Sequence, residues 1–193
     1  MTHKYLKDVY GKMSHIWTWN FIKHRNRVFA GHLFTTVGKE CEGYAPDGTI
    51  FGAVSGVLVR DIPQIIKKHY TAPACVMSIP DYAARNYTLM RLALQHRDVT
   101  LWATANPSTI LELLRTLNEN TEEMIQDIEH GTISDLFDIP YFIREELYAY
   151  VSPKPERADE LRQILQEKGK LEPRDFWPWP LESIGFYRYF HTY

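Results

Sequence analysis

The chain carries the segment Val99-Thr-Leu-Trp-Ala-Thr-Ala-Asn-Pro-Ser-Thr-Ile-Leu-Glu-Leu-Leu-Arg115, in which an apolar, β-prone run ends at Asn106-Pro107 and an amphipathic helix begins at once. The side-chain oxygen of Asn106 can cap free helical N–H groups, and Pro107 suits the first helical position, where its missing N–H costs nothing. Apolar residues then recur at helical spacing, at Ile110, Leu111, Leu113, Leu114 and Leu117. The segment therefore predicts a strand over 99–105 that leads directly into a helix over 106–117.

Such a corner brings a helix N-terminus, with its N–H groups and the positive end of its dipole, to one edge of a sheet. In open α/β sheets, ligands bind beside the carboxyl ends of strands, where corners of this kind lie. Most strand-to-helix corners only connect their elements. A ligand contact and a plain Asn-Pro cap therefore both stay open at this point.

Composition limits the classes of function. The chain has 193 residues, of which 45% are hydrophobic and 24% charged, values that are ordinary for one soluble globular domain. The net charge of −2 gives no basic field, so we expect no nucleic-acid partner. No apolar run approaches the roughly 20 residues that span a bilayer, so we expect no membrane partner. With only two cysteines a disulfide framework is not expected, which favours a cytoplasmic location. Cys41 and Cys75 form no CxxC pair, which favours reduced thiols.

The remaining chain predicts helices interleaved with a few strands. Helices are expected over 3–24, 55–70, 82–96, 120–130, 139–150 and 156–168, and further strands over 28–37 and 181–190. Turn and cap signals bound them: Pro46-Asp47-Gly48 is a turn, Pro80-Asp81 opens a helix, Asn120-Thr-Glu-Glu123 resembles a capping box, and Gly131 and Gly169 end helices.

This order predicts an α/β fold with a small, mostly parallel sheet covered by helices. We treat residues 1–193 as a single domain or subdomain, with an N-terminal helix over 1–27 and a core over 28–150. Residues 151–193 add a C-terminal helix, a Trp/Pro knot and the last strand. A sheet of so few strands is short of cover for its own edges, which suggests that neighbouring chain is missing.

Motifs that would announce a reaction are absent. The sequence has no GxGxxG, no GxxxxGK[ST], no HExxH, no GxSxG and no cysteine pair at zinc spacing, so no metal site is expected. Eight histidines are scattered, as surface and satisfied core histidines usually are. The Trp177-Pro-Trp-Pro180 knot either plugs the end of the core or forms a binding surface. These residues alone leave the catalytic residues unknown.

Several segments nevertheless occur in a familiar order. They are Gly43-Tyr-Ala-Pro-Asp-Gly48, Gly52-Ala-Val-Ser-Gly-Val-Leu58, Tyr87-Thr-Leu-Met-Arg-Leu-Ala-Leu94, Ala105-Asn-Pro-Ser-Thr-Ile-Leu111, Ile125-Gln-Asp-Ile-Glu-His-Gly-Thr132 and Trp177-Pro178. Together they resemble the auxin-responsive promoter family in its bacterial form, over most of residues 28–180. Asp127-Ile128 followed by Gly131-Thr132 looks like that family's DI-x-x-G-T/L signature after a helix.

The resemblance implies an acyl-acid amido synthetase, a ligase similar in fold to part of the N-terminal domain of acyl-adenylate-forming enzymes. Such enzymes use ATP and Mg²⁺ to activate a small carboxylic acid and then pass the acyl group to an amine, often an amino acid. An acyl adenylate splits one difficult amide synthesis into two easier steps.

The chain departs from that family where nucleotide binding is concerned. The Ser/Thr/Gly-rich ATP loop, the later Ser-Thr-Glu-type motif and the C-terminal lid domain have no counterpart here, and Ser183-Ile-Gly-Phe-Tyr187 replaces the usual continuation after Trp177-Pro178. We therefore expect a middle piece of such an enzyme, a fragment or truncated gene product. It should hold no cofactor and be inactive alone.

One set of residues carries over to a site. The resemblance implies that the strand-to-helix corner borders the acyl pocket, where the helix N-terminus would favour a carboxylate or the forming adenylate. The candidate substrate-binding residues are Thr104, Ala105, Asn106, Pro107, Ser108 and Thr109. The alternative is a non-catalytic binding or oligomerisation module. It would form homo-oligomers through exposed sheet edges and a patch at Trp177 and Trp179.

Overall fold

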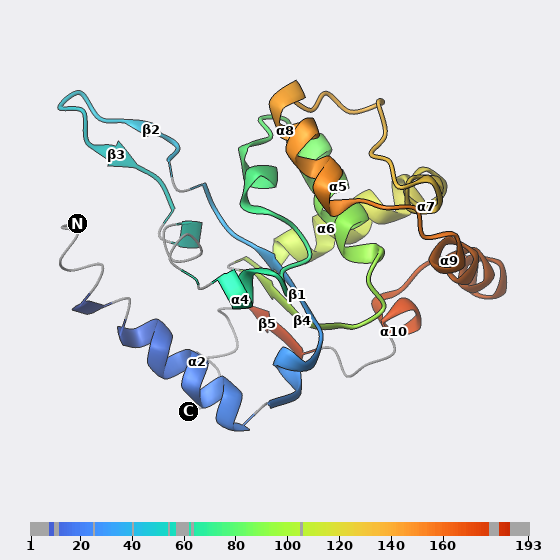
Figure 1. Cartoon of the computed structure of the whole chain (residues 1–193), viewed down its shortest axis with the longest axis horizontal. Coiled ribbons are helices and arrows are strands. Elements are labelled where there is room, and N and C mark those ends of the chain that lie inside the picture. The colour runs from blue at the N-terminus through green and yellow to red at the C-terminus, as the bar shows by residue number, and fades with distance from the viewer. Residues whose placement is uncertain are drawn as a thin grey trace.

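A three-stranded parallel sheet lies at the centre of the molecule (Figure 1). The computed structural model describes residues 8–9, 12–24, 26–39, 41–53, 55–56, 62, 64–104, 106–177 and 182–185. The strands are β1 (His32–Thr36), β4 (Val99–Thr104) and β5 (Glu182–Gly185), in the order β1-β4-β5, and both pairs are parallel. The predicted α/β class with a small parallel sheet is confirmed, and β4, from the segment quoted first, is the middle strand.

The first strand is shorter than the predicted 28–37. Residues Asn26–Ala30 form a 3₁₀ helix instead, and the carbonyl of Val28 accepts a hydrogen bond from the Thr100 hydroxyl at 2.6 Å. The prediction was wrong here because β propensity reports only that a residue fits a pleated surface, not that it pairs with a neighbouring strand. The Val28 carbonyl bonds to a side chain of β4 instead of to a backbone N–H of a neighbouring strand.

A short extended segment covers part of the outer edge of β1. The Leu33 N–H donates to the carbonyl of His69 at 2.7 Å, and the Thr71 N–H donates to the carbonyl of Leu33 at 3.1 Å. The helix predicted over 55–70 is therefore wrong at its end: α4 (Gln64–Lys67) stops before this bridge. Residues 57–61 and 63 of that prediction lie outside the described residues.

The connection predicted over 38–56 contains a hairpin. Strands β2 (Gly43–Tyr44) and β3 (Ile50–Phe51) pair antiparallel and project from the body of the molecule (Figure 1). The predicted turn is confirmed, with Gly48 at a φ of 80°. Asp47 fixes the turn by accepting the Thr49 N–H at 2.9 Å.

Helices cover one side of the sheet (Figure 1). They are α5 (Tyr82–Leu94), α6 (Ser108–Glu119), α7 (Thr121–His130), α8 (Tyr141–Leu147), α9 (Pro155–Lys168) and α10 (Pro173–Phe176). Helix α2 (Lys12–His24) lies apart from them, and its Met13, Ile16 and Trp19 are mostly exposed. None of the helices within the described ranges is long and apolar enough to span a bilayer.

The main core lies between the sheet and the helical layer. Phe34 and Trp102 stack with ring centroids 5.0 Å apart, and Trp177 meets Trp102 edge-on at 5.7 Å. Trp177 is 1% exposed, so the prediction that the Trp/Pro knot plugs the end of the core is confirmed for this residue. Trp177 therefore cannot belong to the alternative surface patch. Trp179 and Pro180 lie outside the described residues.

Local signals predicted most helix ends. The Asp81 carboxylate accepts the Ala84 N–H at 2.7 Å, and Gly131 and Gly169 end α7 and α9 with positive φ. The predicted capping box at Asn120 is wrong. Its side-chain amide turns back and donates to the carbonyl of Thr116 at 2.9 Å, so it makes no cap hydrogen bond to α7.

Two other predicted helices were nearly right in extent. The 139–150 segment divides into α8 and a 3₁₀ turn over Tyr148–Tyr150. Helix α9 begins at Pro155, one residue before the predicted start, and ends where predicted. The last predicted strand, 181–190, is present as β5 over 182–185, and residues 181 and 186–190 lie outside the described part of the chain.

Candidate functional site

The carboxyl ends of the three parallel strands meet at one edge of the sheet. Thr36 of β1, Thr104 of β4 and Gly185 of β5 are partners in register across this edge. Because β4 lies in the middle, Thr104 occupies the centre of the edge, and α6 starts a few residues later. This is the place where α/β sheets bind ligands.

The corner after β4 is built by the residues that the sequence singled out. The side-chain oxygen of Asn106 accepts the N–H of Ser108 at 3.0 Å, and its carbonyl accepts the N–H of Thr109 at 3.0 Å. Pro107 has helical backbone angles of −57° and −28°, so it occupies the first position of the turn although the regular helix begins at Ser108. The predicted Asn-Pro cap is therefore confirmed.

Thr104 has a structural role at this corner. Its hydroxyl donates to the Asn106 carbonyl at 3.1 Å and lies 3.3 Å from the Asn106 N–H, and the residue is 5% exposed. Asn106, Pro107 and Ser108 are exposed and Thr109 is half-buried. Ala105 lies outside the described residues.

The described residues of this edge do not fit Mg²⁺ and ATP. Magnesium prefers carboxylate and phosphate oxygens, and Thr104, Asn106, Ser108 and Thr109 offer hydroxyls and an amide instead. The first N–H groups of the helix, which would hold a phosphate, already bond within the corner. These residues therefore offer ATP and Mg²⁺ neither free N–H groups at the start of α6 nor a carboxylate ligand.

Two of the segments that carry the family resemblance meet in the core. The buried Asp127 carboxylate accepts the Tyr87 hydroxyl at 2.6 Å, the Thr132 hydroxyl at 2.6 Å and the Ser134 N–H at 2.7 Å. The Arg91 guanidinium donates to the carbonyls of Asp127 and Thr132 at 2.9 Å each. The Asp127–Thr132 signature is thus a buried anchor between α5 and the end of α7.

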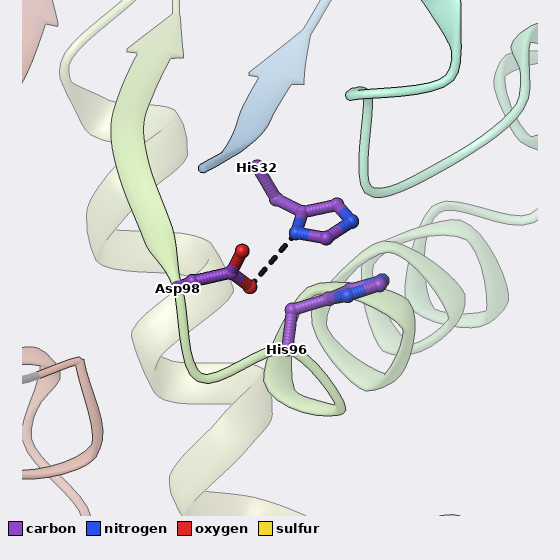
Figure 2. Close-up of side chains that lie close together, drawn as sticks. All are labelled: His32, His96 and Asp98. Carbon is purple, nitrogen blue, oxygen red and sulfur yellow. Dashed lines mark hydrogen bonds and ion pairs between the residues drawn. The ribbon is translucent and has the colours of Figure 1, made fainter. Parts of the chain in front are cut away.

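A second polar site lies at the opposite, amino edge of the sheet (Figure 2). His32 opens β1, Asp98 immediately precedes β4, and His96 lies two residues earlier. His32 Nδ1 lies 2.8 Å from Asp98 Oδ1, and the two imidazole rings stack with centroids 3.8 Å apart. Burial, together with the neighbouring His32 and Lys154, lowers the pKa of His96 to about 3.

Both histidines line a cavity of about 960 Å³. Its wall also carries the side chains of Lys39, Cys75 and Glu146. Sequence reasoning missed this cluster because the histidines are dispersed along the chain. The predicted strand over 28–37 also hid the signal, because only in the structure does β1 begin at His32, beside the start of β4.

The fold and its carboxyl edge define an α/β domain of the kind that binds ligands where parallel strands end. A model of the GH3 family N-terminal domain matches residues 1–182. The chain therefore belongs to the GH3 family, which is the auxin-responsive family that its sequence resembles. No curated protein sequence matches the chain.

Solved structures share the fold. The chain is similar to a GH3.15 acyl acid amido synthetase, with a TM-score of 0.76 and 18% identity over 95% of this chain and 33% of that chain. It is also similar to an AtGH3.15 acyl acid amido synthetase in complex with 2,4-DB, with a TM-score of 0.75, 18% identity and the same coverage. At this identity the likeness shows the fold, and the chain spans about one third of the length of these structures.

Proposed function

We propose that this chain supplies the acyl-acid side of an ATP-dependent acyl-acid amido synthetase. The observation that carries the proposal is family membership over residues 1–182, supported by a shared fold over 95% of the chain. One of the similar structures is a complex with 2,4-DB, which makes a small carboxylic acid the ligand to test first.

The acid would bind at the exposed part of the corner after β4. The N–H groups of Ser108, Thr109 and Ile110 all donate within the corner. A carboxylate would therefore be held by the positive end of the α6 dipole and by the Asn106 amide and Ser108 hydroxyl, which are exposed.

The proposal assigns no adenylation to this chain alone. Its support is that the sequence holds no glycine-rich phosphate loop and that the carboxyl edge presents no carboxylate for Mg²⁺ among the residues just described. In this proposal the chain contributes the scaffold of the acyl pocket, and ATP and Mg²⁺ act on the acid through residues from elsewhere in the intact enzyme.

Saturation-transfer NMR with 2,4-DB tests the proposed pocket. We expect a saturable signal from the full chain that falls several-fold in Ser108→Ala and stays unchanged in Asn118→Ala, an exposed position on the same helix. Equal binding by all three proteins would contradict the assignment of the corner.

Activity is measured separately, by ATP–pyrophosphate exchange with a panel of carboxylic acids. We expect no exchange above background from this chain. Robust exchange would contradict the proposal that it lacks adenylation on its own. Self-association through sheet edges stays a prediction, which light scattering over a concentration series would measure.

A further inference from the structure

The cluster at the amino edge has no part in the proposed function. His32 and Asp98 lie at the starts of β1 and β4, whereas the proposed acyl pocket lies where the same strands end. Figure 2 shows His32 and Asp98 turned toward each other, with the ring of His96 lying against that of His32. The side chains of His32 and Asp98 are 25% and 47% exposed, so solvent reaches them.

The backbone holds all three residues in place. Gly31 packs so closely on the neighbouring strand that an added Cβ would lie 2.0 Å from the Asp98 carbonyl oxygen, and the His32 N–H donates to that oxygen at 2.8 Å. The His96 carbonyl accepts the indole N–H of the buried Trp177 at 2.9 Å. Hydrogen bonds to other parts of the fold therefore hold the backbone beside the cluster, although His96 and Asp98 lie in the connection between α5 and β4.

We propose that His32, His96 and Asp98 bind one divalent transition-metal ion of the zinc class. Two imidazole nitrogens and a carboxylate oxygen are a ligand set that Zn²⁺ accepts, and it leaves a fourth position open. Each residue offers one ligand atom, and these atoms lie within 4.8 Å of one another. A tetrahedral ion needs ligand atoms about 3.4 Å apart, given metal–ligand bonds of about 2.1 Å, so the side chains would rotate to bring these atoms closer together on binding.

The ion would take the place of the hydrogen bond between His32 and Asp98. Their 2.8 Å contact joins a ring nitrogen to a carboxylate oxygen, and both atoms are of the kinds that bind Zn²⁺. Metal binding would cost His96 only a weak hydrogen bond, because the distance between its Nε2 and Gln95 Nε2 is long, at 3.4 Å. The open fourth position would face the cavity that both histidines line.

The nitrogen ligands, and not the nearby cations, set the metal class. Arg91 and Lys154 lie close enough to act on His96, and Lys154 Nζ is 3.4 Å from the Gln95 carbonyl. Their charge works against every divalent cation equally. Nitrogen ligands bind Zn²⁺, Co²⁺ and Ni²⁺ well and bind Mg²⁺ and Ca²⁺ poorly, so selectivity for the former group is the signature of this site.

Metal titration of the full chain tests the proposal. We expect Zn²⁺ to bind in calorimetry with one-to-one stoichiometry and Co²⁺ to give visible absorption bands that Zn²⁺ abolishes. The variants His96→Gln and Asp98→Asn each remove a direct ligand and should weaken Zn²⁺ binding by at least the roughly 10- to 100-fold that loss of an outer-shell partner costs. His130→Gln is the matched control, because His130 is exposed at the end of α7 and should leave the affinity unchanged.

A second measurement uses only the unaltered chain. Two-dimensional NMR of the histidine ring nitrogens should show the two rings of the stacked pair, His32 and His96, shifting with Zn²⁺ while the other histidines stay unchanged. Absence of saturable one-to-one binding, or the same affinity in His96→Gln as in the unaltered chain, would overturn the proposal. Binding of 2,4-DB should not change in these variants, so the two proposals fail independently.

Discussion

Replacing Asp127 by alanine should be the most damaging single change that the structure suggests. The Asp127 carboxylate is 5% exposed and accepts three hydrogen bonds, from the Tyr87 hydroxyl, the Thr132 hydroxyl and the Ser134 N–H. Tyr87 and Ser134 are themselves buried, so alanine would leave two donors without acceptors, whereas the more exposed Thr132 can turn to water.

The magnitude follows from those two donors. A buried polar group left unsatisfied costs about 1–3 kcal/mol, so two such donors together cost about 2–6 kcal/mol. We therefore expect Asp127→Ala to lower the free energy of unfolding by about 2–6 kcal/mol, a large share of the roughly 5–15 kcal/mol of a whole domain. Asp127→Asn keeps the shape and one acceptor oxygen, so it should cost less.

Urea unfolding at pH 7, followed by far-UV circular dichroism and tryptophan fluorescence, measures this difference. Asp159→Ala is the control, because this carboxylate is 75% exposed and pairs with Arg162 at 3.2 Å on the surface. Such a pair contributes about 0–1 kcal/mol. The reasoning is refuted if Asp127→Ala falls within about 1 kcal/mol of the unaltered chain, the upper limit for such a surface pair.

Three further changes test single features of the structure. Gly131→Ala and Gly169→Ala both place alanine at positive φ, but only at Gly131 would the new Cβ lie 2.4 Å from a backbone nitrogen. Gly131→Ala should therefore cost about 1–3 kcal/mol more in urea unfolding, and equal costs would contradict the close approach. Burial and a nearby carboxylate raise the pKa of Cys75 to about 12, whereas Cys41 is exposed. Mass spectrometry after brief iodoacetamide treatment at pH 8 should therefore find Cys41 alkylated first, and equal rates would argue against the raised pKa of the half-buried Cys75 thiol. Asn106→Ala removes the cap of α6 and should lower the free energy of unfolding by about 1 kcal/mol in thermal or urea unfolding. An unchanged free energy of unfolding would show that this hydrogen bond does not stabilise the helix.

Cap signals in the sequence predicted the start of a helix correctly where a side-chain oxygen had a single N–H group within reach. Asp81 and Asn106 cap their helices as predicted, since each side-chain oxygen reaches an N–H two or three residues ahead. The prediction failed at Asn120, where the side chain had a competing partner in the carbonyl of Thr116. It also failed at Val28, whose carbonyl is satisfied by Thr100, 72 residues later in the chain.

The amino-acid sequence by itself determined the helix-and-strand order, the parallel sheet, the corner at Asn106-Pro107 and the family, because these depend on neighbours along the chain and on motif spacing. Only the tertiary structure joined His32 to Asp98 across 66 residues and Tyr87 to Asp127 across 40. Those contacts depend on strand register and helix packing, which bring distant residues together without leaving a local pattern in the sequence. The reason is physical: side-chain periodicity fixes which face of an element is buried, but not which distant residue lies opposite it.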